Sequence, residues 1–473
     1  MSLKKTVAIA AAVGALAAIS VPAMALENEF HGIYNLKFFS SNVENGGTAA
    51  IDPTGYLEKN KANNYFEQRA RLQYTAKAND DLKLVTQFEL DTKFGGDKTG
   101  KYGISSDGGV FDADGISLET KHVYLDFNLG KNINVRTGIQ PIKDSLKGIF
   151  LDADLAGVQA TSKMGAATLT GGYFRYKTES SLLTTGAAAP AGTGVNGTQS
   201  TSFFTNTSPL GHDNADIFTL DAKIALNKDA KVGASYYLLS DYSTATVTTF
   251  HVVGLNADAK VGPLSLSGFL AAETGFVGST PRRKAISGYA ANVAAKVAIG
   301  PGTLKTAALY LTGDGNTGNG NNTAWNSTGS ATYAEGGMFL LVRTGVGGTS
   351  TDRTLTGANF TSNKGLILYT LGFDAAITPK LYTNVNLGML WAAKNLGAPT
   401  DGGLPGSKPN ASNFRGGEIN LETGYKVYDN LTAKVQLAYV LLGGYYKHSA
   451  ANLDPTKSPE DPYTGRVALS YAF

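Results

Sequence analysis

The sequence predicts an all-β fold, an antiparallel transmembrane β-barrel of about 18 strands, from three observations. Apolar and polar residues alternate along segments of about ten residues, the length of a tilted membrane-crossing strand. Tight turns and long polar loops alternate between these segments. Beyond residue 25, no apolar run approaches the ~20 residues that a membrane helix needs. A barrel needs no such run, because lipid-facing and lumen-facing residues alternate in its strands.

The composition argues against an ordinary soluble protein. A chain of 473 residues could form two or three soluble domains, but charged residues make up only 17% of it, against roughly 25% in such domains. The absence of Cys excludes disulfides, thiolate metal sites and covalent c-type haem. Abundant aromatic residues argue against disorder. The net charge of +3 gives no indication of nucleic-acid binding.

The N-terminus has the three parts of a secretory signal. Lys4 and Lys5 precede a small apolar stretch at residues 7–19, and Ala23-Met24-Ala25 is an A-x-A-like cleavage site. We therefore expect a Sec signal peptide at residues 1–25 and one barrel domain at residues 26–473. The alternative, an N-terminal membrane anchor, is disfavoured because the run is short and rich in Ala.

The hairpin at residues 69–91 shows the repeating unit. Ala70, Leu72 and Tyr74 share one face of the first strand, and Arg69 and Arg71 lie on the other. A polar turn at residues 79–81 then leads into a second strand with the same alternation.

The unit recurs to the end of the chain. The predicted strands are residues 30–41, 69–78, 82–91, 122–129, 133–140, 157–163, 167–176, 216–226, 231–240, 250–261, 264–272, 284–299, 303–312, 366–377, 381–394, 418–428, 431–446 and 464–473. The count could also be 16, and residues 332–343 could add a hairpin within a loop.

The connections on one side are tight turns, whereas most of those on the other are long and rich in Gly, Asn, Ser and Thr. Short periplasmic turns and long extracellular loops are typical of outer-membrane barrels.

The closing segment carries a family resemblance. Val467, Leu469, Tyr471 and Phe473 fall on one face, and Phe473 is the last residue. This pattern resembles the closing strand of Gram-negative outer-membrane proteins, in which it is the signal read by the barrel-assembly machinery. An ordinary amphipathic strand at a chain end is the alternative. The resemblance implies location in the outer membrane among lipids that include lipopolysaccharide.

The architecture further resembles the porins, whose loop after the fifth strand folds into the lumen and narrows it. The fifth predicted strand here is residues 133–140, and the following residues 141–155 combine apolar and acidic side chains. Such a segment suits packing against a barrel wall better than open solvent. The resemblance implies a homotrimer and a water-filled channel for small polar solutes.

The candidate site residues are charged side chains expected to line the narrowest part of the channel, where they would set its selectivity. The expected basic wall contains Arg69, Arg71, Lys83 and Arg136, with Lys37 and His122 on the same faces. The expected pore loop contributes Asp144, Lys147, Asp152 and Asp154. A basic wall facing an acidic loop would set a transverse field. Alternatively, each charge is a solvated lumen residue that tunes nothing.

Other functions have weaker support. No His lies in a metal-binding H-x-x-x-H or H-E-x-x-H spacing, and no G-x-S-x-G motif occurs, so we expect no catalytic residues, metal or cofactor. Tyr residues in the strands suit interfacial girdles better than a sugar-stacking path. Two functions remain: passive diffusion of small hydrophilic solutes and ions, or a barrel that sheathes a partner such as an outer-membrane electron-transfer cytochrome.

Overall fold

A computed structural model provides the structure of the protein. It describes residues 26–44, 62–96, 108–109, 118–178, 214–243, 247–278, 283–315, 320–328, 331–344, 354–356, 364–394, 412–446 and 460–473. The predicted signal peptide at residues 1–25 lies outside this described part.

Strands dominate the described residues. The strands that form the barrel are β1 (Glu27–Ser41), β2 (Asn63–Asn79), β3 (Leu82–Gly96), β5 (Leu118–Leu129), β6 (Ile133–Lys143), β7 (Asp152–Met164), β8 (Ala167–Thr178), β9 (Asn214–Ala225), β10 (Ala230–Asp241), β11 (Val247–Val261), β12 (Leu264–Gly278), β13 (Lys284–Ile299), β14 (Gly302–Leu311), β15 (Leu366–Ala376), β16 (Leu381–Trp391), β17 (Phe414–Tyr428), β18 (Leu431–Leu442) and β19 (Tyr463–Ala472). The two-residue β4 (Gly108–Gly109) pairs only with β3, and η3 (Gly444–Tyr446) is a short 3₁₀ helix. No helix among the described residues is both long enough and apolar enough to cross a membrane.

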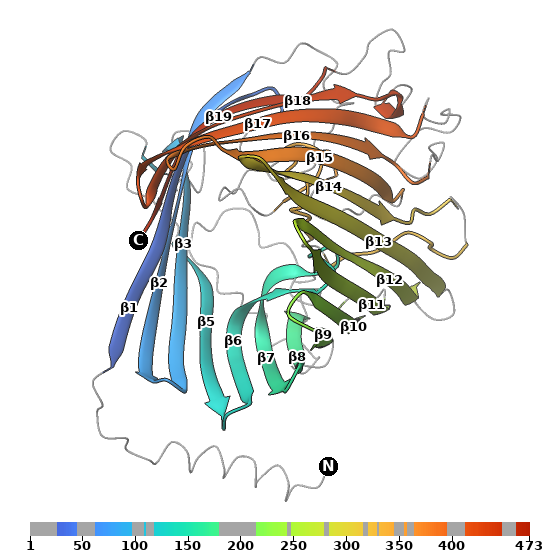
Figure 1. Ribbon diagram of the computed structural model, residues 1–473. Coiled ribbons are helices and arrows are strands. Elements are labelled where there is room, and N and C mark those ends of the chain that lie inside the picture. The colour runs from blue at the N-terminus through green and yellow to red at the C-terminus, as the bar shows by residue number, and fades with distance from the viewer. Residues whose placement is uncertain are drawn as a thin grey trace, which may run out of the picture.

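The sheet closes on itself. Each barrel strand pairs antiparallel with the next, and β1 pairs with both β2 and β19 (Figure 1). Without β4, the nineteen strands give a closed barrel of eighteen. The all-β barrel predicted from alternation is therefore confirmed, including the pair β7 and β8. Closure removes the exposed edges that an open sheet would present.

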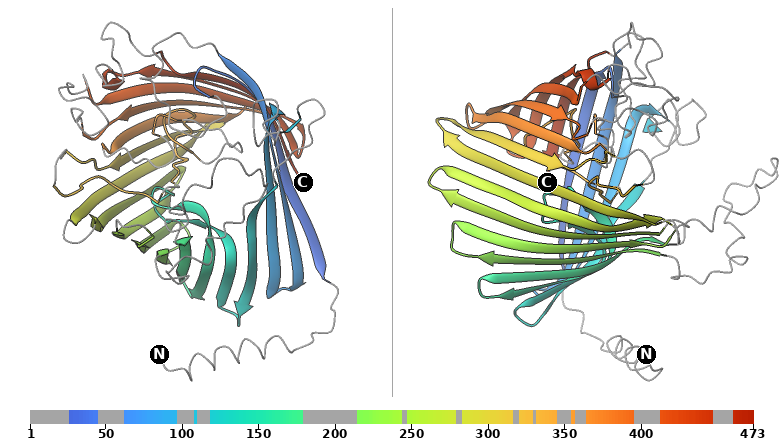
Figure 2. Two further views of the ribbon diagram at one scale, coloured as in Figure 1. Left: turned by 180° about the vertical axis from the view of Figure 1, so that it is seen from behind. Right: turned by 90° about the vertical axis from the view of Figure 1, so that its right-hand side faces the viewer.

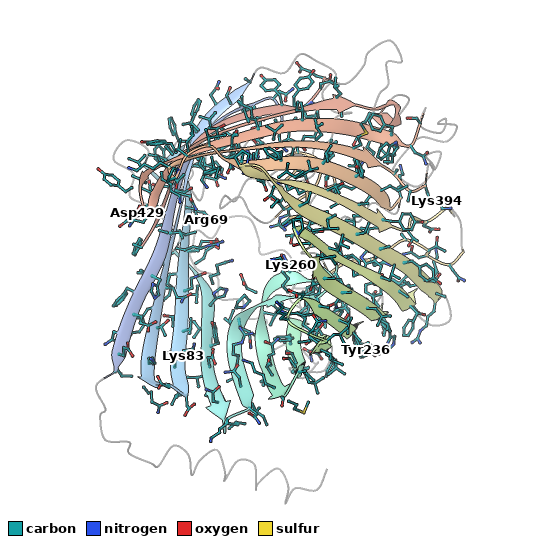
Figure 3. All side chains as sticks on the ribbon, in the orientation of Figure 1. Arg69, Lys83, Tyr236, Lys260, Lys394 and Asp429 are labelled. Carbon is teal, nitrogen blue, oxygen red and sulfur yellow. The ribbon has the colours of Figure 1, made fainter. Side chains whose placement is uncertain are left out.

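Alternation along the strands separates an apolar outer face from a polar inner one. Leu255 and Leu270, on adjacent strands, are 61% and 66% exposed on the outside. Asn256, the next residue after Leu255, points inward and donates a hydrogen bond to Ser145 Oγ inside the barrel (3.3 Å). Figure 3 shows side chains on both faces of the wall, with Arg69 on the inner face. The pattern suits a wall with lipid outside and water inside.

The first and last strands of the barrel meet at the end of the barrel that carries the tight turns. Gly32 N donates to Phe473 O (2.9 Å), and Phe473 N donates to Gly32 O (3.0 Å). In Figure 2 the strands run at a slant between their two ends, as a closed barrel requires. The even strand count explains why both termini lie at the same end.

Among the described residues, two longer segments of the chain lie in the interior, where one was predicted. Residues 144–151, between β6 and β7, include the fully buried Leu146 and Phe150. Residues 320–328 and 331–344, between β14 and β15, bury the apolar run at residues 340–342. The described part of residues 331–344 forms no strand, so the optional hairpin at residues 332–343 is an irregular inward segment instead. We call these the first and the second inward segment.

The first inward segment is shorter than predicted. Residues 141–143 pair with residues 152–154, so they extend the β6–β7 hairpin. Asp152 and Asp154 consequently lie on β7 and not in a loop, which corrects the predicted span of 141–155. Pro141 fits the extension because β5 pairs with β6 only as far as Ile139, so no neighbouring strand needs the missing N–H.

Candidate functional site

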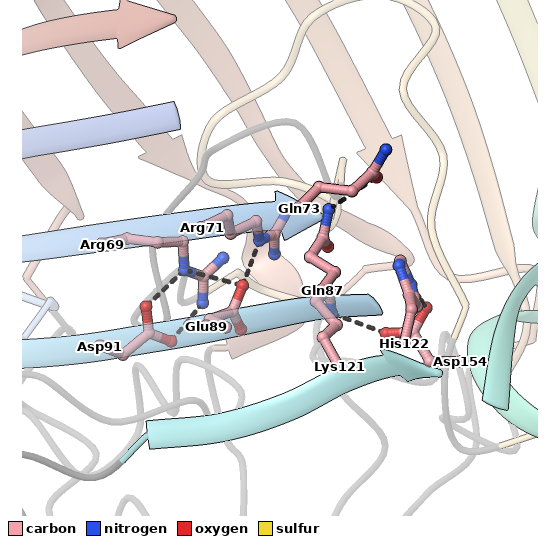
Figure 4. A network of polar contacts seen from close by, with 9 residues as sticks. All are labelled: Arg69, Arg71, Gln73, Gln87, Glu89, Asp91, Lys121, His122 and Asp154. Atoms are coloured by element: carbon pink, nitrogen blue, oxygen red, sulfur yellow. Dashed lines mark hydrogen bonds and ion pairs between the residues drawn. The ribbon is translucent and has the colours of Figure 1, made fainter. Parts of the chain in front are cut away.

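The predicted basic wall carries its own acidic partners. Arg69 contacts both oxygens of Asp91 at 2.5 Å, and Arg71 pairs with Glu89 (Figure 4). The register places each Arg directly opposite its acid on β2 and β3. Bidentate pairing fixes the guanidinium plane of Arg69. This part of the lumen is therefore a ladder of alternating charges, in which acids lie opposite the Arg residues of the predicted basic wall.

Lys83 and Arg136 line the same side of the lumen. Lys83 Nζ lies 3.5 Å from an oxygen of Asp126, and its side chain is 44% exposed. Arg136 donates to Gln159 Oε1 at 2.6 Å, across β6 and β7. All four predicted basic residues thus lie on the inner face of β2, β3 and β6. Their charges are mostly balanced locally.

The β6–β7 extension turns back toward β5. Asp154 accepts hydrogen bonds from Lys121 (2.6 Å) and lies 2.8 Å from His122 Nε2 (Figure 4). Both partners lie on the part of β5 that β6 no longer covers. Asp154 therefore faces two basic side chains, of which His122 was expected on the faces of the basic wall. The basic partners are Lys121 and His122, however, and not the Arg residues of β2.

The carboxylate of Asp144 accepts hydrogen bonds from the backbone of its own loop. Its two oxygens accept N–H groups from Leu146, Gly148, Phe150 and Leu151 at 2.6–2.8 Å. Burial raises the pKa of Asp144 to about 6, although these four donors stabilise the ionised form. The carboxyl group is too buried to face a solute, so its expected place in a transverse field is wrong. It holds the shape of the first inward segment.

The second inward segment is held by carboxylates of the wall. Glu418 of β17 accepts backbone N–H groups from Phe339 (2.7 Å), Leu340 (3.0 Å) and Leu341 (2.8 Å). Glu273 of β12 accepts from Asn326 N (2.9 Å) and Nδ2 (2.8 Å). These bonds satisfy donors that would otherwise be buried without partners.

Small residues in the wall give the inward segments room. A Cβ added to Gly254 on β11 would lie 2.6 Å from Cδ2 of Leu146. A Cβ on Gly388 of β16 would collide with the sulfur of Met338. Any larger residue at either position would displace an inward segment.

The two inward segments also contact each other. Thr332 N donates to Gly148 O, and Thr328 N donates to Phe150 O, both at 2.9 Å. Lys147, at the centre of the first segment, forms an ion pair with Glu335 at 2.5 Å. Sequence reasoning placed Lys147 in the lumen but missed Glu335, and it considered residues 332–343 only as a hairpin within a loop. The available signal was the apolar run at residues 338–342 inside a loop rich in Gly and Asn.

The C-terminal residues occupy the outer face. Val467, Leu469, Tyr471 and Phe473 are all exposed on the outside of β19 and at its end, and the last two rings stack. The four residues therefore share one face, as their spacing predicts. Recognition of this strand by an assembly machinery stays a prediction. Among the described residues, no three His, Cys, Asp or Glu side chains gather as a metal site would need.

Comparison with known proteins identifies the fold. The outer-membrane protein OpdK from Pseudomonas aeruginosa superposes with a TM-score of 0.54 at 11% identity, over 94% of this chain and 98% of that one. OccAB4 from Acinetobacter baumannii gives 0.53 at 10% identity, over 96% and 100%. OccAB1 from the same species gives 0.51 at 12%, over 94% and 96%. Neither a family model nor a curated protein matches the sequence. The chain thus has the fold of these outer-membrane proteins, and the porin-like architecture is confirmed at the level of the fold.

Proposed function

We propose that this protein, as a barrel of residues 26–473, is an outer-membrane channel through which small hydrophilic solutes and ions diffuse. One observation supports this above all: a closed wall, apolar outside, surrounds an interior lined by charged and amide side chains. Such a wall is stable only where lipid lies outside and water inside. The two inward segments narrow this interior.

The structural neighbours support the same assignment. OpdK from Pseudomonas aeruginosa is an outer-membrane protein that has also been solved with vanillate, an aromatic carboxylate. At this level of identity the neighbours bear on the architecture, not on the solute. By analogy with the resemblance drawn from the sequence, we propose assembly through the C-terminal strand, contact with lipopolysaccharide, and a homotrimer.

A channel accounts for the interior better than a sheath. A sheath must leave room for a folded partner, whereas here Leu146, Phe150 and Trp325 of the chain itself are buried inside the barrel. The two segments that carry them are bonded to the wall and to each other. An interior already occupied in this way favours a narrow aqueous path. We also propose that the protein is not an enzyme.

The first test is conductance in planar bilayers. Purified full-length protein, with its signal removed, is expected to insert and give discrete open steps at constant voltage. Heat-denatured protein serves as the control. Absence of steps from correctly folded barrel, or haem absorbance that co-purifies with it, would contradict the channel and favour the sheath.

The second test concerns the charge ladder. Arg69→Ala leaves Asp91 without its partner and should shift selectivity toward cations, whereas Asp152→Ala removes an acid beside Lys143 and should shift it toward anions. One unit charge about 8 Å from the ion path in water is worth ~0.5 kcal/mol, or about a twofold change in local ion concentration. Reversal potentials in a dilute salt gradient measure both shifts.

The matched control is Asp80→Ala. This acid lies in the β2–β3 turn, and its side chain is 96% exposed. Its removal should leave the reversal potential unchanged. Equal selectivity in Arg69→Ala, Asp152→Ala and the wild type would show that neither charge lines the ion path.

A further inference from the structure

A cavity of about 380 Å³ lies on the inner face of β10–β13, near the tight turns of these strands. Small-molecule ligands bind in pockets of about 300–1,000 Å³, so this cavity has the size of a solute site. Its charged lining residues are Lys228, Asp229, Lys231, Asp258, Lys260, Lys296 and Glu335, and Ser265 and Ser267 supply hydroxyl groups. Lys260 and Lys296 face the lumen, because the residues that alternate with them, such as Val261 and Val293, are exposed on the outer face (Figure 3).

The positive charges of this cavity outnumber the negative ones. Each acid has a lysine beside it: Glu335 with Lys147 at 2.5 Å, Asp229 with Lys228 at 3.9 Å, and Asp258 directly opposite Lys231 in the sheet register. Lys260 and Lys296 are left over, and among the described residues neither of them forms an ion pair. The cavity therefore carries two positive charges without acidic partners.

The two unpaired lysines flank one hydroxyl group. Lys260 lies directly opposite Ser265, and Ser265 lies directly opposite Lys296, on three adjacent strands. The two lysine Cα atoms are therefore about 10 Å apart, and their long side chains can converge over the serine. Lys296 also lies directly opposite Lys305, which is paired with Asp374 at 2.6 Å. Like charges directly opposite each other destabilise a sheet, so this row is favourable only when a negative charge binds to it.

Lys147 keeps the nearest acid of the inward segments from supplying that negative charge. Its Nζ donates to Ser267 Oγ (2.8 Å), at the edge of the cavity, and to Glu335 (2.5 Å). Its φ of 66° lies in the left-handed region, and among the described residues it is the only residue other than Gly with a positive φ. This conformation is unfavourable for a residue with a Cβ, and such residues gather at functional sites. The strained Lys147 neutralises Glu335 and so leaves the charges of Lys260 and Lys296 in place.

We propose that this cavity binds a phosphate group, as the free ion or as part of a small ester, between Lys260, Lys296 and Ser265 Oγ. A phosphate monoester carries about −1.5 to −2 charges at pH 7 and three strong acceptor oxygens. It therefore matches two ammonium groups and one hydroxyl donor, whereas a monocarboxylate neutralises one lysine and a cation is repelled. The inference rests on the proposed channel, and it adds an anion subsite to its lumen.

Inorganic phosphate is the probe for the test. Titrated at pH 7.5 into the folded barrel in a non-ionic detergent, it should bind saturably by calorimetry, without any need for conduction. Lys260→Gln and Lys296→Gln should each weaken binding about tenfold, the effect of one unit charge in contact with a dianion in a solvated site. In planar bilayers, phosphate should reduce the wild-type chloride current with the same midpoint.

Lys434→Gln is the matched control. Lys434 is a lumen lysine on β18, opposite the buried Ala468, and β18 lies five strands from β13 in the sheet order. This variant loses the same charge but should bind phosphate like the wild type. Equal weakening in all three variants would mean that phosphate responds only to the net charge of the lumen, which would overturn the site.

Two further probes define the solute. Displacement of inorganic phosphate by glycerol 3-phosphate would assign the site to phosphate esters, and failure to displace it would assign the site to the free ion; either result supports a phosphate site. Tighter binding of acetate or succinate than of phosphate would overturn it. A conducting wild type without saturable phosphate binding would also overturn the site and leave the channel intact. Phosphate binding without conductance would overturn the channel alone.

Discussion

Replacing Glu418 by Ala is expected to enlarge the single-channel conductance by releasing the second inward segment. Glu418 is buried on β17 and accepts three consecutive backbone N–H groups, from Phe339 to Leu341. A water molecule could replace one of these bonds, but three adjacent donors in a dry site need an acceptor of fixed geometry. Their loss removes the main polar attachment of this part of the segment to the wall.

The size of the effect follows from the unsatisfied donors. Each buried donor left without a partner costs about 1–3 kcal/mol, so three cost roughly 3–9 kcal/mol. Since 1.4 kcal/mol is a tenfold change in an equilibrium constant, a docked segment would become mostly undocked. We expect conductance to at least double and to become noisier. Limited proteolysis should cut residues 331–344 in the variant but not in the wild type.

Glu422→Ala is the control that distinguishes the loss of docking in Glu418→Ala from the loss of a negative charge. Glu422 lies on the same strand and face, but it accepts hydrogen bonds from the side chains of Tyr382 and Gln436 and not from the backbone of the inward segment. The Glu422→Ala variant removes the same charge from the lumen but leaves the backbone of residues 339–341 bound to Glu418. If both variants conduct alike, Glu418 acts through its charge, and the docking explanation is wrong.

The barrel was predictable because its signal is local. Alternation in a hairpin such as residues 69–91 follows from one face in lipid and one in water, and each tight turn fixes the register of its two strands. The structure confirms the strands, their order and the even count. The same register places Glu89 opposite Arg71 and Asp91 opposite Arg69. The paired nature of the wall could therefore have been predicted from that hairpin.

The interior was not predictable in the same way. The apolar residues of the second inward segment show no regular periodicity, because the segment is neither a strand nor a helix. Its attachment to Glu418 joins residues almost eighty positions apart. The role of Asp144 depended on a loop conformation that turns four N–H groups toward one carboxylate. Charge type alone suggested that this acid faces the channel. Long-range contacts and backbone conformation decided otherwise.

The second large effect is expected at the seam where the first and last strands close the barrel. Glu44, just after β1, is fully buried and forms an ion pair with Arg466 of β19. Thr464 also donates to Glu44, and the ring of Phe39 lies 5.3 Å from the Arg466 guanidinium. This pair thus joins the two ends of the sheet by side chains, in addition to the ladder of β1 and β19.

Glu44→Ala should destabilise the barrel by about 3–5 kcal/mol, because it leaves a buried guanidinium without its carboxylate. Urea unfolding of the protein in lipid vesicles measures this loss. The double variant Glu44→Leu with Arg466→Met should recover most of the stability, since removing both charges removes the cost of burying them. Lys77→Ala is the control: its pairs with Glu27 and Asp80 lie at the surface, where solvent screening leaves them little effect on stability. A Glu44→Ala variant no less stable than Lys77→Ala would mean that backbone pairing alone closes the barrel, with the ion pair adding nothing at the seam.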